Sequence, residues 1–89
     1  MKAIMTVIGA DRVGIVASVS AALAEMNVNI LDISQTIMDG VFTMTVSVDT
    51  GASSCSFEEI RAALTAMGEK MQLNIHIQST DIFTAMHRI

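Results

Sequence analysis

The chain has 89 residues, a formal net charge of −4 and 52% hydrophobic residues. This length predicts a single domain with a thin core, which self-association would help to bury. The acidic balance, the scattered basic residues and the lack of Trp and Tyr argue against direct binding of nucleic acid. No apolar run reaches the roughly 20 residues of a membrane-spanning helix, so no membrane association is expected.

The single cysteine and the start of the chain indicate the cellular compartment of the protein. Cys55 is the single cysteine and cannot form an internal disulfide, which is typical of a reducing environment. The segment that follows Met1 already reads as a strand and has no signal-peptide layout. We therefore expect a cytoplasmic protein.

The spacing of apolar residues predicts a strand–helix–strand unit that occurs twice. Asp39-Gly40 predicts a tight hairpin between the two units, because both central residues of a type I′ turn need positive φ. Ser56 and Glu59 have the spacing of a capping box at the start of the second helix. The predicted strands cover residues 2–8, 29–38, 41–49 and 73–79, and the predicted helices cover residues 13–26 and the segment after Ser56.

Right-handed crossovers place both helices on one face of the resulting antiparallel sheet. The predicted fold is therefore α+β, a ferredoxin-like βαββαβ sandwich with sheet order 4-1-3-2. Residues 1–79 would form this domain, and residues 80–89 a short C-terminal helical extension. In the extension an apolar face is expected to be buried on the sheet or on a partner subunit. That face consists of Ile82, Phe83, Met86 and Ile89.

A turn bounded by two glycines joins the first strand to the first helix. The first amides of a helix lack intrahelical partners and carry the positive end of the helix dipole, so a carboxylate can bind there. Structural roles are also open: Asp11 and Arg12 as solvated turn residues, with Asp11 capping the helix, and Gly14 as a packing contact. The candidate binding residues of this turn are Gly9, Ala10, Asp11, Arg12, Val13, Gly14 and Ile15.

The run from Asp11 to Val16, followed by Asn29-Ile30 at the start of the second strand, resembles the ACT domain. Within that family, the chain is most similar to stand-alone bacterial proteins related to the glycine-cleavage-system transcriptional repressor. ACT domains are regulatory modules, many of which bind amino acids. The resemblance implies a homodimer, with higher assembly open, in which Asn29, Ile30 and Leu31 of a neighbouring subunit close the pocket. It further implies an amino-acid-like ligand, a regulated protein partner, no cofactor and no enzymatic activity.

Two other functions are open. An acylphosphatase-like hydrolase would use Arg12 to hold phosphate and Asn29 to orient water, although the glutamine-glycine-valine loop of that family is missing. A structural interaction protein would bind no small molecule. Asn29 could also serve only to end the first helix in a left-handed conformation.

The remaining reactive side chains indicate no further chemistry. His76 is predicted on an exposed strand face and His87 near the chain end, and no third ligand lies at metal-binding spacing. We therefore expect no metal site. Cys55 has no activating neighbour in its serine-rich loop. Most of the eight methionines are interpreted as core residues.

Overall fold

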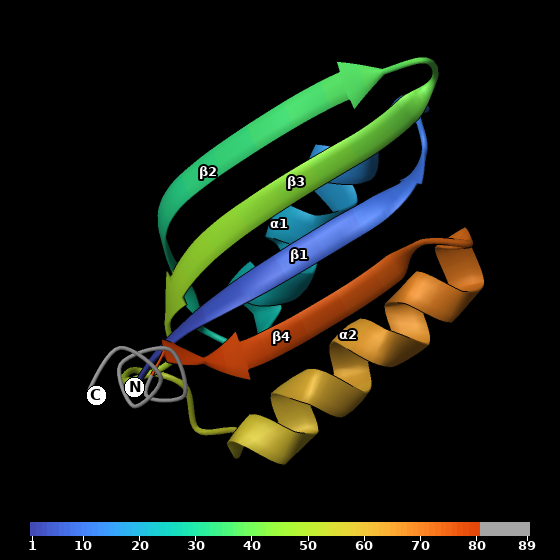
Figure 1. Ribbon diagram of the computed structural model, residues 1–89. Helices are drawn as coiled ribbons and strands as arrows, with labels where there is room; N and C mark the ends of the chain where they lie inside the picture. Colours follow the sequence, from blue (N-terminus) through green and yellow to red (C-terminus); the bar gives the residue numbers. More distant parts are fainter. Residues whose placement is uncertain (81–89) are drawn as a thin grey trace, which may run out of the picture.

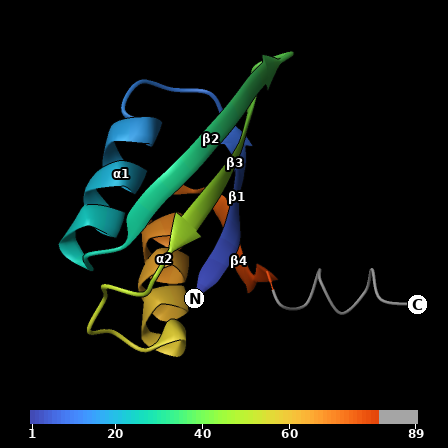
Figure 2. The ribbon, with the colours of Figure 1, turned by 90° about the vertical axis from the view of Figure 1, so that its left-hand side faces the viewer.

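A four-stranded antiparallel sheet forms one layer, and two helices form the other. The computed structural model describes residues 1–80, so the predicted C-terminal helix lies outside the described residues. The sheet order is β2-β3-β1-β4, and both helices cover the same face (Figures 1 and 2). The predicted ferredoxin-like βαββαβ fold and its strand order are confirmed. The elements are β1 (Lys2–Ala10), α1 (Ile15–Glu25), β2 (Asn29–Met38), β3 (Val41–Asp49), α2 (Phe57–Met71) and β4 (Asn74–Ser79).

The strand register defines two ends of the sheet. At one end, the first residue of β1, Lys2, pairs with Asp49, which also pairs with Asn29 at the start of β2. At the other end, Ala10 pairs with Val41, the partner of Met38. The sheet therefore places the turn after β1 beside the β2–β3 hairpin, and the start of β2 at the far end.

Two local sequence signals, the capping box and the hairpin turn, are confirmed by the structure. The backbone N–H of Ser56 donates to Glu59 Oε1 over 2.8 Å, and Ser56 Oγ accepts from the Glu59 N–H over 3.1 Å. These two bonds are the predicted capping box of α2. At the hairpin, Asp39 and Gly40 have φ of 52° and 76°, as a type I′ turn requires.

The core lies between the sheet and the helices. Every helix and strand except β2 supplies buried apolar side chains. β2 lies at an edge of the sheet, and its side chains are exposed or only partly buried. The core members within these five elements are Ala3, Met5, Val7, Ile15, Val19, Leu23, Phe42, Met44, Val46, Val48, Ile60, Leu64, Ile75 and Ile77.

Several boundaries differ from the sequence prediction for conformational reasons. α1 begins at Ile15 and not at residue 13, because Gly14 has φ +94° and cannot be helical. β1 continues to Ala10, beyond the predicted end at residue 8, because Gly9 and Ala10 pair with β3. The left-handed residue after α1 is Asn27, with φ 57°, and Asn29 is already in β2. The idea that Asn29 ends the helix is therefore wrong.

Candidate functional site

The turn between β1 and α1 leaves the first amides of α1 open. Gly14 is the N-cap residue and its backbone carbonyl accepts from Ser18 over 2.9 Å. Within residues 1–80, no side chain makes a capping hydrogen bond at this helix, and the first turn contains no acidic residue. The unpaired amides and the uncompensated helix dipole favour an anion at this position.

Gly14 faces open space. A Cβ built on this residue would meet no atom of residues 1–80 within 4 Å, so the packing role considered for Gly14 is wrong. The residue is a glycine because of its left-handed φ, and Val13 beside it is fully exposed. The described part of the chain therefore leaves the space beside Gly14, at the start of α1, open.

The close packing that was considered for Gly14 is found instead at Gly9. A Cβ on Gly9 would lie 2.5 Å from Leu73 Cδ2 and 3.4 Å from the Gln72 carbonyl oxygen. The missing side chain therefore lets the end of β1 pack against the α2–β4 connection. This role is structural, and Gly9 is partly buried there.

Asp11 and Arg12 connect the turn to its neighbours. The Asp11 N–H donates to the Gly40 carbonyl over 2.9 Å, which attaches the turn to the β2–β3 hairpin. Asp11 does not cap α1, because the cap position belongs to Gly14. The Arg12 guanidinium donates to the backbone carbonyl of Met71 at the end of α2. Sequence reasoning missed Met71, because no local pattern links residues 59 positions apart.

The second predicted cluster lies at the other end of the sheet. Asn29 pairs with Asp49 and Ile30 with Val48, while Leu31 is the extra residue at an irregularity between Ile30 and Asp32. One chain therefore does not bring Asn29, Ile30 and Leu31 to the turn. For the same reason, it does not bring Asn29 to Arg12, the pair that an acylphosphatase-like mechanism requires.

The other reactive side chains lie apart from the turn. His76 is exposed on β4, and Cys55 is half-buried, with its N–H donating to Ser53 Oγ over 3.1 Å. Residues 1–80 contain no group of three or more His, Cys, Asp and Glu side chains placed to hold a metal ion. Neither helix in this part of the chain has the length and apolar character needed to cross a membrane.

The sequence pattern of the ACT domain matches residues 2–78. A UPF0237 protein of Listeria innocua is 54% identical over 89 residues, which are 100% of both chains. The chain belongs to the UPF0237 family of ACT-domain proteins. An ACT domain protein from Streptococcus pneumoniae has a similar structure, with a TM-score of 0.83, 46% identity and 93% of each chain covered.

The expected relation of this ACT-domain protein to the glycine-cleavage repressor holds only at the level of the fold. The structure of a putative glycine cleavage system transcriptional repressor has a TM-score of 0.77 but 21% identity. It matches 86% of this chain and 44% of the repressor chain. The closer kinship is with stand-alone UPF0237 proteins.

Proposed function

We propose that this ACT-domain protein is a regulatory module that binds an amino acid or a similar carboxylate at the start of α1. The observation that carries the proposal is the uncapped α1 N-terminus behind Gly14, which faces open space at a turn of ACT-domain sequence. The ligand carboxylate would accept hydrogen bonds from the first α1 amides. Ile15 begins this helix, and Val13 and Gly14 border the approach.

A second subunit would complete the pocket through the edge of β2. Within residues 1–80, this strand has strand partners on the β3 side only, and it exposes several apolar side chains. An exposed apolar edge strand is a template for pairing with another chain. Leu31 is 46% exposed, Ile33 39%, Ile37 55% and Met38 67%.

Antiparallel pairing of two β2 strands would bring the separated clusters together. A two-fold axis near Ile33 or Ser34 places the start of one β2 opposite the end of the other. The end of β2 lies beside the turn, because Gly40 in the following hairpin accepts from the Asp11 N–H. Asn29, Ile30 and Leu31 of the second copy would thus approach the α1 N-terminus, and the ligand would lie between subunits.

Such a site links ligand binding to assembly. A ligand that contacts both subunits binds the dimer better than the monomer, so it shifts the equilibrium toward the dimer by its differential affinity. The dimer with ligand would then present a different surface to a regulated protein partner. This linkage predicts that the dimer dissociation constant falls as ligand is added.

The first experiment is a thermal-shift screen of the twenty amino acids with the full-length chain. A ligand that binds only the folded protein raises the melting temperature with concentration. Binding of the hits is then measured by calorimetry in two matched variants. Ala17 is exposed in the first turn of α1, so its replacement tests the helix end without disturbing the core.

Ala17→Glu adds a carboxylate beside the open amides, and Ala17→Gln adds a neutral side chain of similar size. We expect Ala17→Glu to weaken amino-acid binding about tenfold or more, and Ala17→Gln to change it little. Equal binding by both variants would place the ligand elsewhere. No response to any amino acid would favour the ligand-free interaction protein.

A further inference from the structure

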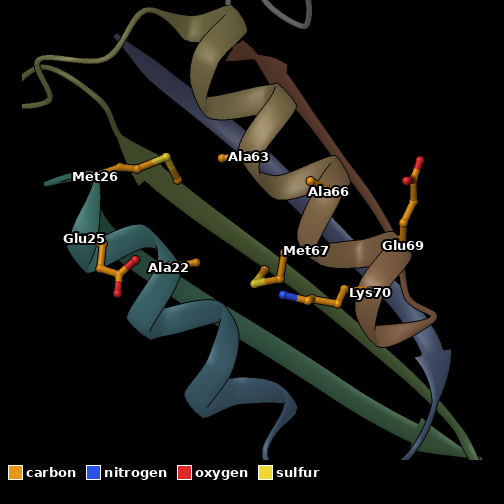
Figure 3. A pocket seen from close by; sticks show the side chains of 8 residues that line it. All are labelled: Ala22, Glu25, Met26, Ala63, Ala66, Met67, Glu69 and Lys70. Carbon is orange, nitrogen blue, oxygen red and sulfur yellow. The ribbon is translucent and has the colours of Figure 1, made fainter.

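A groove runs between the outer sides of the two helices, away from the sheet (Figure 3). Its volume is about 740 Å³. Met26, the C-cap residue of α1, and Met67 of α2 point into the space between the helices, and Lys70 points toward α1. The groove is lined by Ala22, Glu25, Met26, Ala63, Ala66, Met67, Glu69 and Lys70.

The lining is apolar along its length and charged near its ends. The three alanines have small side chains, so the backbone of a partner can approach closely. The two flexible methionines can adapt to an irregular partner surface. α1 and α2 run antiparallel, so Glu25 at the end of α1 and Lys70 near the end of α2 lie toward opposite ends of the groove. Glu69 borders the groove beside Lys70, but its side chain points away from α1 (Figure 3). An occupant with the opposite charge order would match both ends.

We infer that this groove binds residues 81–89 of a second copy of the chain. The sequence of that segment places Ile82, Phe83, Met86 and Ile89 at the spacing of one helical face. Short amphipathic helices bind apolar grooves through anchors of this spacing. The segment carries an acidic residue at its start, Asp81, and a basic residue, Arg88, near its end.

The length and the charges of segment 81–89 determine its orientation in the groove. In a helix, Asp81 and Arg88 are about 10 Å apart along the axis, about the same as the rise from Ala63 to Lys70 along α2. With Asp81 near Lys70 and Arg88 near Glu25, both charges meet an opposite charge. The segment then runs antiparallel to α2, and its apolar face contacts the alanine and methionine lining.

The same orientation requires a second copy. Thr80 Oγ1 donates to the Lys2 carbonyl over 3.1 Å, at the end of the sheet where α2 begins. Lys70 is in the last turn of α2, about 20 Å further along the helix axis. One residue spans at most about 3.8 Å, so Asp81 cannot reach Lys70 of its own chain.

Two further points support a function for this segment and its groove. The match to the Listeria innocua protein spans all 89 residues of both chains, so that relative also has a segment at this position. The groove is on the helical face, whereas β2 is at a sheet edge, so this contact is independent of the proposed ligand site. Docking of the segment would add a second contact to a β2-paired dimer or link such dimers together.

The direct test is zero-length carbodiimide cross-linking of full-length chains. Lys2 and Lys70 are the two lysines of the sequence, so an Asp81–Lys70 product is readily assigned by mass spectrometry. Equal amounts of ¹⁴N-labelled and ¹⁵N-labelled protein are mixed before the reaction. We expect Asp81–Lys70 peptides, about half of which join a light to a heavy chain.

Matched variants identify the groove. Ala66→Trp fills it, whereas Ala62→Trp alters an exposed α2 residue outside it. We expect Ala66→Trp to reduce the cross-link more than tenfold and Ala62→Trp to leave it unchanged. Circular dichroism confirms that each variant is folded.

A charge exchange provides a second test that does not depend on a large substitution. Arg88→Glu and Glu25→Arg should each weaken the cross-link about two- to fivefold, as expected for an exposed ion pair, and the double variant should restore it. Absence of the Asp81–Lys70 product would overturn the inference. Cross-links confined to chains of one label, or equal yields in the two Trp variants, would do the same.

Discussion

The guanidinium of Arg12 donates a hydrogen bond to the backbone carbonyl of Met71, and this bond attaches the turn before α1 to the last turn of α2. The carbonyls at a helix C-terminus carry its negative dipole end, which a cation stabilises. Gly9 strengthens the same junction, because only a missing side chain allows its contact with Leu73. The proposed ligand turn and the end of α2 therefore form one packed unit.

Loss of this bond should reduce stability by a small, measurable amount. We expect Arg12→Gln to lower the free energy of unfolding by about 0.5–1 kcal/mol, because the helix end loses an exposed charged donor. The matched control is Lys70→Gln, which removes a cation from the same turn of α2 but keeps the Arg12–Met71 bond. Urea unfolding measures both, and an equal loss in the two variants would indicate a general charge effect.

Gly68 reverses the usual expectation for a glycine inside a helix. By helix propensity alone, Gly68→Ala should stabilise α2 by about 1 kcal/mol. A Cβ on Gly68 would lie 2.7 Å from the Leu73 carbonyl oxygen and 3.2 Å from Ile75 Cγ1. Because the backbone of the α2–β4 connection must shift, we expect Gly68→Ala to destabilise the protein by about 1–3 kcal/mol.

The control for Gly68 is Thr65→Ala, at an exposed position of the same helix. This change should raise the free energy of unfolding by a few tenths of a kcal/mol, up to about 0.7, through propensity alone. Thermal melts of the two variants should therefore shift in opposite directions. A higher melting temperature for Gly68→Ala would show that the contact with Leu73 relaxes without cost.

Periodicity and local turn chemistry predicted the fold because each signal acts within a few residues. The alternation around Met44 and Val46, the Asp39-Gly40 hairpin and the Ser56 cap all formed as expected. The helix start was placed two residues early, because the spacing of apolar residues does not reveal the sign of φ at Gly14.

The candidate site was less accessible to sequence reasoning because it depends on contacts between distant segments. The turn was located correctly, but the bond from Arg12 to Met71 depends on how α2 packs. The groove is formed by outward-facing residues of two helices, and the signal for it was the presence of alanines such as Ala63 and Ala66 where solvated helices usually carry charges. Whether Asn29 reaches the turn depends on a second subunit, which no pattern within one chain specifies.

The capping box should make α2 sensitive to acid. The backbone hydrogen bond from Ser56 holds the pKa of Glu59 below its ordinary value. A lowered pKa in the folded state means that the carboxylate stabilises the protein at pH values above the pKa of the unfolded state, about 4.3. That stabilisation is lost as the pH falls through the lower pKa of the folded state. Glu59→Gln keeps a neutral acceptor at this position and should therefore lose less stability between pH 7 and about pH 2.5.

A second carboxylate provides the internal reference for that measurement. The backbone hydrogen bond from Gly51, and then the amino terminus, hold the pKa of Asp49 below its ordinary value. Its contribution is also lost in acid, but equally in the wild type and in Glu59→Gln. The difference between their denaturant midpoints thus reports Glu59 alone. A constant difference from pH 7 to about pH 2.5 would contradict the role of the charge.

The proposed β2 pairing predicts a charge-dependent exchange of partners. In a dimer with its axis near Ile33 or Ser34, the two Ile33 side chains lie on the same face and are direct or diagonal neighbours. Ile33→Lys and Ile33→Glu should each weaken self-association, because like charges would face each other across the axis. Ile33 is at an exposed edge, so either variant can fold as a monomer.

Mixing the two variants should restore pairing, since a lysine then faces a glutamate. We expect sedimentation equilibrium to show mainly monomer for each variant alone and a heterodimer in the mixture, with an affinity at least about tenfold higher than either homodimer. Asp39→Lys is the matched control, because it changes charge in the hairpin beyond β2. Dimers that persist in both Ile33 variants, with no preference for the mixture, would place the subunit contact away from the β2 edge and separate Asn29 from the ligand turn.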